Sequence, residues 1–284
     1  MALSISNAFV TLFDSEVRQA YQASRSLAGL TREKQVQGST VKFNVLGEGV
    51  ATIRSPMADV TPLNATFSQK SASMVDYIAS EYSDVFQQSH VNFEERNELV
   101  QLVGNAIGRR MDQTAIDAIV AEGSPGTVAN TIQEDGSAGS AADLNTGKIR
   151  AAKKIMDAAN VPPDNRCLLI HANNLSSLLG QTSATSADFA SVKSLVDGSI
   201  NTWLGYRVVV IGDRTEGGLP KDGSNDRSVF AFHKESVGMG ISMNQKTEVN
   251  YVPEKTSWLI TSMFGAGAVS IQASGIVKIT CREA

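Results

Sequence analysis

Apolar residues recur every three or four positions between Asn92 and Glu122, a spacing that predicts one long amphipathic helix. Asn92 is a capping residue, and Glu95 stands three positions later, where its side chain reaches back to the cap. At about 1.5 Å per residue this helix is roughly 45 Å long. We expect it to act as a spine lying against a sheet. Its apolar stripe is Leu99, Leu102, Val103, Ala106, Ile107, Met111, Ala115, Ile116 and Ile119.

The N-terminal segment from about Asn7 to Leu30 also has helical spacing, with Phe9, Phe13, Val17 and Tyr21 among its apolar positions. This pattern is typical of an amphipathic arm. Such an arm either folds onto its own core or docks on a neighbouring subunit, and the sequence leaves both possibilities open.

The period changes to two after Gly38, where Val41, Phe43 and Val45 alternate with more polar residues. Gly47-Glu48-Gly49 predicts a turn, and Val50–Ile53 a returning strand of a β-hairpin. Further extended chain is expected through Phe67 to Ile78, with a short helical turn over 83–88. Two such polar strands are only marginally stable alone in water, so the hairpin needs a surface to pack against. We favour the surface of another molecule.

A small α/β layer is predicted after the glycine- and serine-rich connection 123–142. A helix over 146–159 buries Ile149, Ala152 and Met156 and directs Lys148, Arg150, Lys153 and Lys154 outward. The remaining predicted elements are strands Cys167–Ile170, Arg207–Ile211 and Ser228–His233, helices over 173–179 and 192–196, and an exposed loop over 212–227.

The C-terminal segment is predicted to be all β, with strands Ser257–Met263, Gly265–Gln272 and Gly275–Cys281 separated by glycines. If these strands pair beside the spine helix, the domain that contains the helix is discontinuous, and the α/β layer is inserted between its two parts.

The composition is that of an ordinary soluble protein. The 284 residues are 42% hydrophobic and 19% charged, enough for a substantial core. The net charge of −4 argues against a broad basic face for nucleic acid, so any DNA contact is expected to be local or weak. Cys167 and Cys281 are far apart, which indicates two reduced, buried thiols. The N-terminus lacks a signal-peptide pattern and charges interrupt the spine stripe, so we expect a cytoplasmic protein with no membrane span.

Candidate chemistry is sparse. His90, His171 and His233 have no partner at a metal-ligand spacing, so no metal or cofactor is expected. His171 and Asp213 follow buried strands of the α/β layer, where catalytic residues often lie, and are the best enzyme candidates. Polar residues at strand ends are more often turn-formers, and the chain lacks a nucleophile elbow or dinucleotide-binding turn.

Two further pairs lie within the spine helix. Gly104 and Gly108 are four residues apart, which suits close approach of another backbone. Arg109 and Arg110 follow them and face either solvent or the carboxylates of an adjacent element.

The order of these elements and several sequence motifs resemble the major capsid protein of tailed bacteriophages, in particular the short-tailed podovirus type. The matching motifs cover the first 120 residues closely, whereas the last 120 or so residues match the family mainly in the order of their elements. They are Phe13-Asp14-x-x-Val17-x-x-Ala20-Tyr21-Gln22, Gly38-Ser39-Thr40-Val41-Lys42-Phe43, Asp59-Val60-Thr61-Pro62, Val91-Asn92-Phe93-Glu94-Glu95-Arg96-x-Glu98-Leu99-Val100 and Ala106-Ile107-Gly108-Arg109-Arg110-x-Asp112-Gln113.

The resemblance implies an α+β fold with an N-terminal arm, an extended E-loop hairpin, a spine helix in a discontinuous peripheral domain and an inserted α/β axial domain. It implies the ranges 1–36 for the arm, 37–80 for the E-loop, 81–145 for the peripheral domain with the spine helix over 92–122, 146–250 for the axial domain and 251–284 for the returning strands. The residues expected at intersubunit contacts are Phe13, Tyr21, Val41, Lys42, Phe43, Arg54, Arg109 and Arg110.

The implied function is that of a structural, non-enzymatic subunit that assembles in the bacterial cytoplasm into pentamers and hexamers of an icosahedral virion shell. The implied partners are a scaffolding protein, a portal and a cement protein, and the shell encloses double-stranded DNA and expands when DNA is packaged. The Lys-to-Asn crosslink of some relatives is not carried over to Lys42 or Lys70, because no acceptor environment is identifiable. The alternatives are an encapsulin-like compartment of the same fold and an α/β enzyme using His171 and Asp213.

Overall fold

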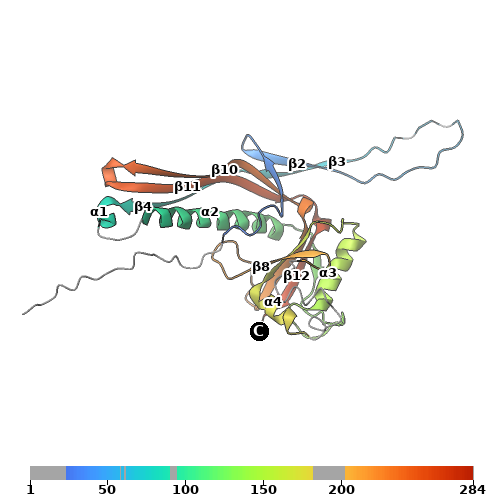
Figure 1. Ribbon diagram of the computed structural model, residues 1–284. Coiled ribbons are helices and arrows are strands. Elements are labelled where there is room, and N and C mark those ends of the chain that lie inside the picture. Colours follow the sequence, from blue (N-terminus) through green and yellow to red (C-terminus); the bar gives the residue numbers. More distant parts are fainter. Residues whose placement is uncertain (1–23, 58, 61, 90–94, 182–201, 284) are drawn as a thin grey trace, which may run out of the picture.

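The structure is a computed structural model that describes residues 24–57, 59–60, 62–89, 95–181 and 202–283. Within these residues a long layer and a compact layer meet at an angle, and a ribbon projects away from the long layer (Figure 1). The predicted arm residues Phe13 and Tyr21, the cap Asn92, His90 and the helix over 192–196 lie outside the described residues.

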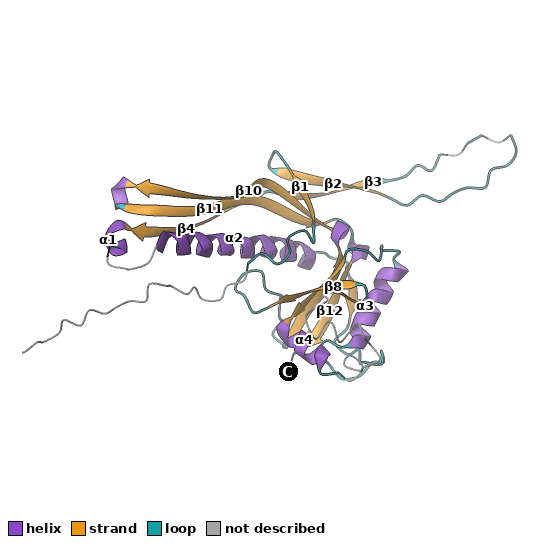
Figure 2. Cartoon of the chain, viewed as in Figure 1, coloured by secondary structure: helices purple, strands orange, loops and turns teal. Residues whose placement is uncertain are grey.

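The long layer is a four-stranded sheet with a helix along one face (Figures 1 and 2). Its strand order is β1-β10-β11-β4, where β1 is parallel to β10 and the other pairs are antiparallel. The bounds are Arg32–Gln35 for β1, Val75–Asp84 for β4, Val237–Val252 for β10 and Ser257–Ser270 for β11. A short helix α1, Val85–Gln88, follows β4, and the 3-10 turn η2, Pro253–Lys255, joins β10 to β11.

The predicted spine helix is confirmed as α2, Glu95–Val120. Ile107 and Met111 pack against Met239, Ile241 and Phe264 of β10 and β11, so the three- and four-residue spacing buries one stripe on the sheet. Because β4 precedes α2 in sequence and β10 and β11 follow the α/β layer, this layer is discontinuous in sequence, as expected.

The compact layer is a six-stranded mixed sheet with the order β5-β12-β9-β6-β8-β7. Its strands are Gly126–Val128 for β5, Arg166–His171 for β6, Thr202–Trp203 for β7, Tyr206–Ile211 for β8, Asp226–His233 for β9 and Ile276–Arg282 for β12. Helices α3, Thr146–Ala158, and α4, Ala172–Leu179, contribute Ile149, Met156 and Leu178 to the core on one face. The end of α2 contributes Ile116 and Ile119 to a second cluster, with Leu27 and Leu30.

Two short 3-10 turns connect the layers. Turn η1, Lys234–Ser236, joins β9 to β10, and η3, Ala273–Gly275, joins β11 to β12. The Ile271 N–H donates to the Ser236 carbonyl at 2.8 Å, so the two crossings lie side by side.

The predicted hairpin pairing is wrong. Strand β2, Thr40–Leu46, does not pair with Val50–Ile53 but with β3, Phe67–Ser73, in the register Thr40↔Ser73 to Leu46↔Phe67. Between them, residues 47–57, 59–60 and 62–66 form a long loop, and no turn forms at Gly47–Gly49. The Gly47 N–H still donates to the Thr66 carbonyl at 2.8 Å, which closes the ladder at the base of the loop.

The predicted break between strands Ser257–Met263 and Gly265–Gln272 is also wrong, because β11 runs through Gly265 and Gly267. Neither glycine ends the strand, and Gly267 makes room for the crossing ribbon. A Cβ atom on Gly267 would lie 2.2 Å from the backbone carbonyl oxygen of Ser73 in the crossing ribbon. The 16-residue partner strand β10 was not predicted.

Lys148 corrects the predicted outer face of α3. It is fully buried, and its Nζ donates to the carbonyls of Ala142 and Thr280, the second at 3.1 Å. Burial lowers its pKa below the ordinary value. The loop over 212–227 is likewise only partly exposed, since Leu219 belongs to the core.

Candidate assembly surfaces

The segment 47–66, hereafter the distal loop, lies at the end of the projecting ribbon (Figure 1). Several of its apolar side chains are exposed to solvent. Val50 is 81% exposed, and Ile53 and Met57 are fully exposed. Val60, Leu63 and the flanking Leu46 and Phe67 are also exposed. A cluster of large apolar side chains in water marks an interaction surface.

The base of the ribbon is seated within its own chain. Val41 and Phe43 are 1% and 3% exposed and pack with Ala72 and Ile271. Gly238 and Gly240 of β10 make this possible, because a Cβ on Gly238 would meet the Phe43 ring at 2.6 Å and one on Gly240 would meet Val41 Cγ1 at 2.8 Å. The expectation that the hairpin lies on the surface of another molecule is therefore wrong for the face carrying Val41 and Phe43, which is buried in its own chain.

Lys42 and Arg54, the other predicted contact residues of the ribbon, are exposed. In the spine, Arg110 lies over the Tyr77 ring, with Cζ 4.6 Å from the centroid, and Nη1 is 3.7 Å from Glu216. The hydrogen bond with Tyr77 raises the pKa of Arg110. Arg109 is half-buried on the same helix. The structure holds one chain, so contacts of these residues with a second chain stay a prediction.

The face of the long sheet opposite α2 carries a second apolar surface. Tyr77 stacks on Phe264 on the α2 side, so the alternation of β4 places Ile78 and Tyr82 on the other face. Ile78 is 70% exposed and pairs in register with Met263, and Tyr82 pairs with Leu259. Among the described residues no helix covers this sheet face.

Asp112 joins three segments at the middle of the spine, a role that the sequence did not reveal. Its buried carboxylate accepts the N–H groups of Ser26 and Leu27 at 2.7 and 3.0 Å, and Nη1 of Arg214 lies 3.3 Å away. Burial raises the pKa of Asp112 despite these partners. Gly108 allows the same approach, because a Cβ there would lie 3.1 Å from the Arg25 nitrogen. The predicted close packing at Gly108 is with the chain's own N-terminal segment.

The two enzyme candidates are brought together: His171 Nε2 lies 3.1 Å from Asp213 Oδ1. His171 is 2% exposed, whereas the Asp213 side chain is 81% exposed, so the pair is at the surface and not in a closed pocket. Arg227 reaches both Asp213, at 3.3 Å, and Glu283, and Lys221 lies 2.9 Å from Glu283. This cluster is a compensated set of charges.

The cysteines and the possible metal ligands among the described residues do not form a reactive or metal-binding site. Cys167 and Cys281 are buried, and burial raises the pKa of each to about 12, so both stay protonated at neutral pH. Within the described residues no group of three His, Cys, Asp or Glu side chains is arranged to hold a metal ion. None of the described helices is long and apolar enough to span a membrane.

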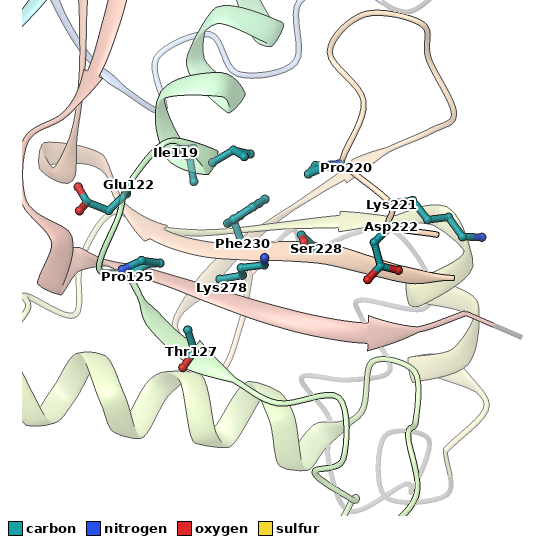
Figure 3. A pocket seen from close by; sticks show the side chains of 11 residues that line it. Ile119, Glu122, Pro125, Thr127, Pro220, Lys221, Asp222, Ser228, Phe230 and Lys278 are labelled. Carbon is teal, nitrogen blue, oxygen red and sulfur yellow. The ribbon is translucent and has the colours of Figure 1, made fainter. Parts of the chain in front are cut away.

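A surface hollow of about 440 Å³ lies between the end of α2, the sheet strands β5, β9 and β12, and the loop at Pro220 (Figure 3). Ile119 and Phe230 form its floor, and Lys221, Asp222 and Lys278 line it as well. Glu122 at its edge accepts a hydrogen bond from Ser270, which lowers the Glu122 pKa. The mixed charges of this lining do not select one ligand class.

Comparison with known proteins identifies the architecture. The model of the family described as phage capsid protein matches residues 5–283. No curated protein matches the chain. Among solved structures, that of Mycobacterium phage Che8 is 18% identical with a TM-score of 0.73 and covers 97% of this chain and 98% of its own. The capsid of cyanophage P-SCSP1u is 16% identical with a TM-score of 0.76 and covers 98% and 94%.

A third similar structure, the capsid of a native GTA particle, is 14% identical with a TM-score of 0.67 and covers 99% of this chain and 98% of its own. At these identities the solved structures establish the fold, and the family model, which spans nearly the whole chain, establishes the family. Neither the family model nor the solved structures favour the two alternatives, an α/β enzyme and an encapsulin-like compartment. The chain therefore belongs to the phage capsid protein family, as a major capsid protein of a tailed phage and a structural, non-enzymatic subunit of the capsid shell.

Proposed function

We propose that the subunits join through the distal loop, which lies on the apolar sheet face of a neighbouring copy opposite α2. The observation that carries this proposal is the exposure of Val50, Ile53 and Met57 at the end of a ribbon whose base is fixed in its own chain. The loop is held by its base, and no apolar surface among the described residues covers these three side chains.

The receiving surface has matching chemistry. Ile78, Tyr82 and the neighbouring Met243 expose apolar area on the sheet, and Met243 pairs in register with Gly265 beside them. Covering one Val, Ile or Met side chain contributes about 1.5–3 kcal/mol. Three such side chains supply several kcal/mol per contact. A heterologous contact of this kind, repeated by rotation, closes into rings and shells.

We further propose pentamers and hexamers in an icosahedral shell around double-stranded DNA, assembled in the bacterial cytoplasm with a scaffolding protein and completed by a portal and a cement protein. Within it, the ribbon would serve as the E-loop, the long layer as the peripheral domain and the α/β layer as the axial domain. The net charge of −4 supports the enclosure of DNA without strong binding.

The test is assembly of a triple variant, Val50→Ser with Ile53→Ser and Met57→Ser. We expect a folded chain that forms no shells in electron micrographs, because the three side chains are exposed and add little to the stability of the single chain. The matched control, Thr52→Ser with Ser55→Ala, changes exposed polar residues of the same loop and should assemble normally. Shells of normal yield from the triple variant would contradict the proposed contact.

A further inference from the structure

Residues 24–35, hereafter the strap, contact α2 at Asp112 and then form β1 at the edge of the long sheet. We propose that the strap opens as one unit from an otherwise folded chain, and that the buried carboxylate of Asp112 is the catch that holds it closed. The contacts involved all lie within one chain, so the strap does not depend on how the copies join in the shell.

The catch consists of charge-assisted hydrogen bonds. Ser26 and Leu27 lie outside helices and strands, so their N–H groups need another partner, and the Asp112 carboxylate accepts both at 2.7 and 3.0 Å. Arg214, from the loop after β8, adds a second link. Its Nη2 donates to the Ser26 hydroxyl oxygen at 2.8 Å, and its Nη1 lies 3.3 Å from the carboxylate. Loss of the carboxylate charge therefore weakens this end of the strap.

The other end of the strap is held mainly by backbone pairing. All four residues of β1 are exposed, and β1 is an edge strand that pairs with β10. A hollow of about 410 Å³ lies between β1, β10 and Met111 of α2, and no β1 residue belongs to an apolar cluster of the described residues. Gln35 adds one exposed hydrogen bond, from Nε2 to Asn244 Oδ1 at 2.6 Å. Apolar packing therefore does not fix β1 to the spine.

Ion pairs add little to the closed state. Arg25 pairs with Glu33, but both residues belong to the strap, so the pair moves with it. Arg32 lies 3.3 Å from Glu235, and more than half of each side chain is exposed, so water and salt screen this pair. Arg25 Nε and Thr31 Oγ1 are buried without a hydrogen-bond partner within the described residues. Opening gives both atoms access to water, which lowers the cost of opening.

Apolar packing sets the limits of the unit. Within the strap, Leu27 and Leu30 are buried in a core cluster, so they close the strap together with the catch. Packing resumes just after β1 at Val36, which packs against the cluster at the base of the ribbon. The Val36 N–H also donates to the Ile241 carbonyl at 2.9 Å. The base of the ribbon therefore stays seated when the strap opens.

Opening uncovers two surfaces of the same chain. The backbone groups of β10 that pair with β1, between Gly238 and Ile241, become a free strand edge. The sites of Leu27 and Leu30 become an apolar hollow against the end of α2 and the compact sheet. Asp112 therefore controls access to both surfaces.

Hydrogen–deuterium exchange of the full-length protein tests the strap at β1, because Asp112 has no hydrogen bond or ion pair with β1 among the described residues. In low urea, we expect β1 amides of the wild type to exchange through an opening that depends only weakly on urea. Amides of α3 should need strongly urea-dependent global unfolding. Asp112→Asn should speed the exchange of β1 by at least about fivefold, with an unchanged far-UV circular dichroism spectrum.

Asp117→Asn is the matched control on the same helix. Asp117 is exposed, and the amide oxygen of the variant can still accept the hydrogen bond from Gln113, so β1 exchange should stay within about twofold of the wild type. Arg214→Gln keeps the Asp112 carboxylate but removes the guanidinium, and should give a smaller rise at β1 even if Asp112→Asn does not fold. A rise confined to residues 26–27, or no rise at β1 in either catch variant, would overturn the proposal. Equal rates and equal urea dependence of β1 and α3 in the wild type would overturn it as well.

Discussion

The buried carboxylate of Glu283 contacts two cations, Arg227 and Lys221. Arg227 Nε approaches Oε1 at 2.5 Å, Arg227 Nη2 approaches Oε2 at 3.2 Å, and Lys221 adds a third contact. Arg227 is itself buried, so the carboxylate also compensates a cation that water does not reach. The C-terminal segment is thereby fixed to β9 by charge as well as by strand pairing.

Glu283→Gln should reduce the free energy of unfolding by about 3 kcal/mol at pH 7, because it removes the buried counter-charge of Arg227 and leaves only the exposed Asp213 beside it. The pKa of Glu283 is lowered in the folded chain, so this contribution is complete above the ordinary value of 4.5 and is lost as the pH falls through the lowered value. Urea unfolding at pH 7 and in acid, in the non-assembling loop variant, measures it. Glu254→Gln, an exposed acid, is the control and should change neither value.

At this scale the sequence predicted the buried thiols and placed His171 and Asp213 at neighbouring strand ends, because parallel strands bring their carboxyl ends together. It did not reveal Glu283, Arg227 or Asp112, since no local pattern announces a charge whose partners are distant in sequence. Lys148 was misjudged for the same reason: its helical position gives its direction, but its two carbonyl partners come from other segments.

Among the elements, helices were the most predictable. The apolar spacing of α2 and α3 is set within a few turns, and the structure confirms both nearly to their predicted ends. Strand pairing depends on partners far along the chain. The distal loop separates β2 from β3, so the turn that Gly47 and Gly49 indicated locally led to the wrong predicted partner for β2. In β10 and β11, Gly238, Gly240 and Gly267 make room for the crossing ribbon, which only the tertiary structure shows.

Gly267→Ala should destabilise the seat of the ribbon by about 1–3 kcal/mol, because the new Cβ would lie 2.2 Å from the Ser73 carbonyl oxygen, a backbone atom that cannot rotate away. Hydrogen exchange of β2 and β3 should rise, and the urea midpoint should fall. Gly223→Ala is the control, since a Cβ there meets nothing within 4 Å. Unchanged exchange in Gly267→Ala would show that the ribbon is not held at this crossing.

For the whole molecule, folding and assembly should be separable. If the distal loop joins copies, the wild-type unfolding midpoint should rise with total protein concentration, because association stabilises the folded chain by mass action. The triple loop variant should unfold at a midpoint independent of concentration. Thermal unfolding over a hundredfold concentration range, followed by circular dichroism, distinguishes the two. A concentration-dependent midpoint in the variant would place the main contact elsewhere.

The two crossings between the layers have a mechanical consequence. Strand β9 continues through η1 into β10, and β11 continues through η3 into β12, so each sheet passes two adjacent strands directly to the other. A pull on the ribbon is therefore transmitted from one sheet to the other along covalent backbone and the hydrogen bonds of the strand ladders. In a wall made of such subunits, outward pressure is therefore carried in part along continuous polypeptide backbone.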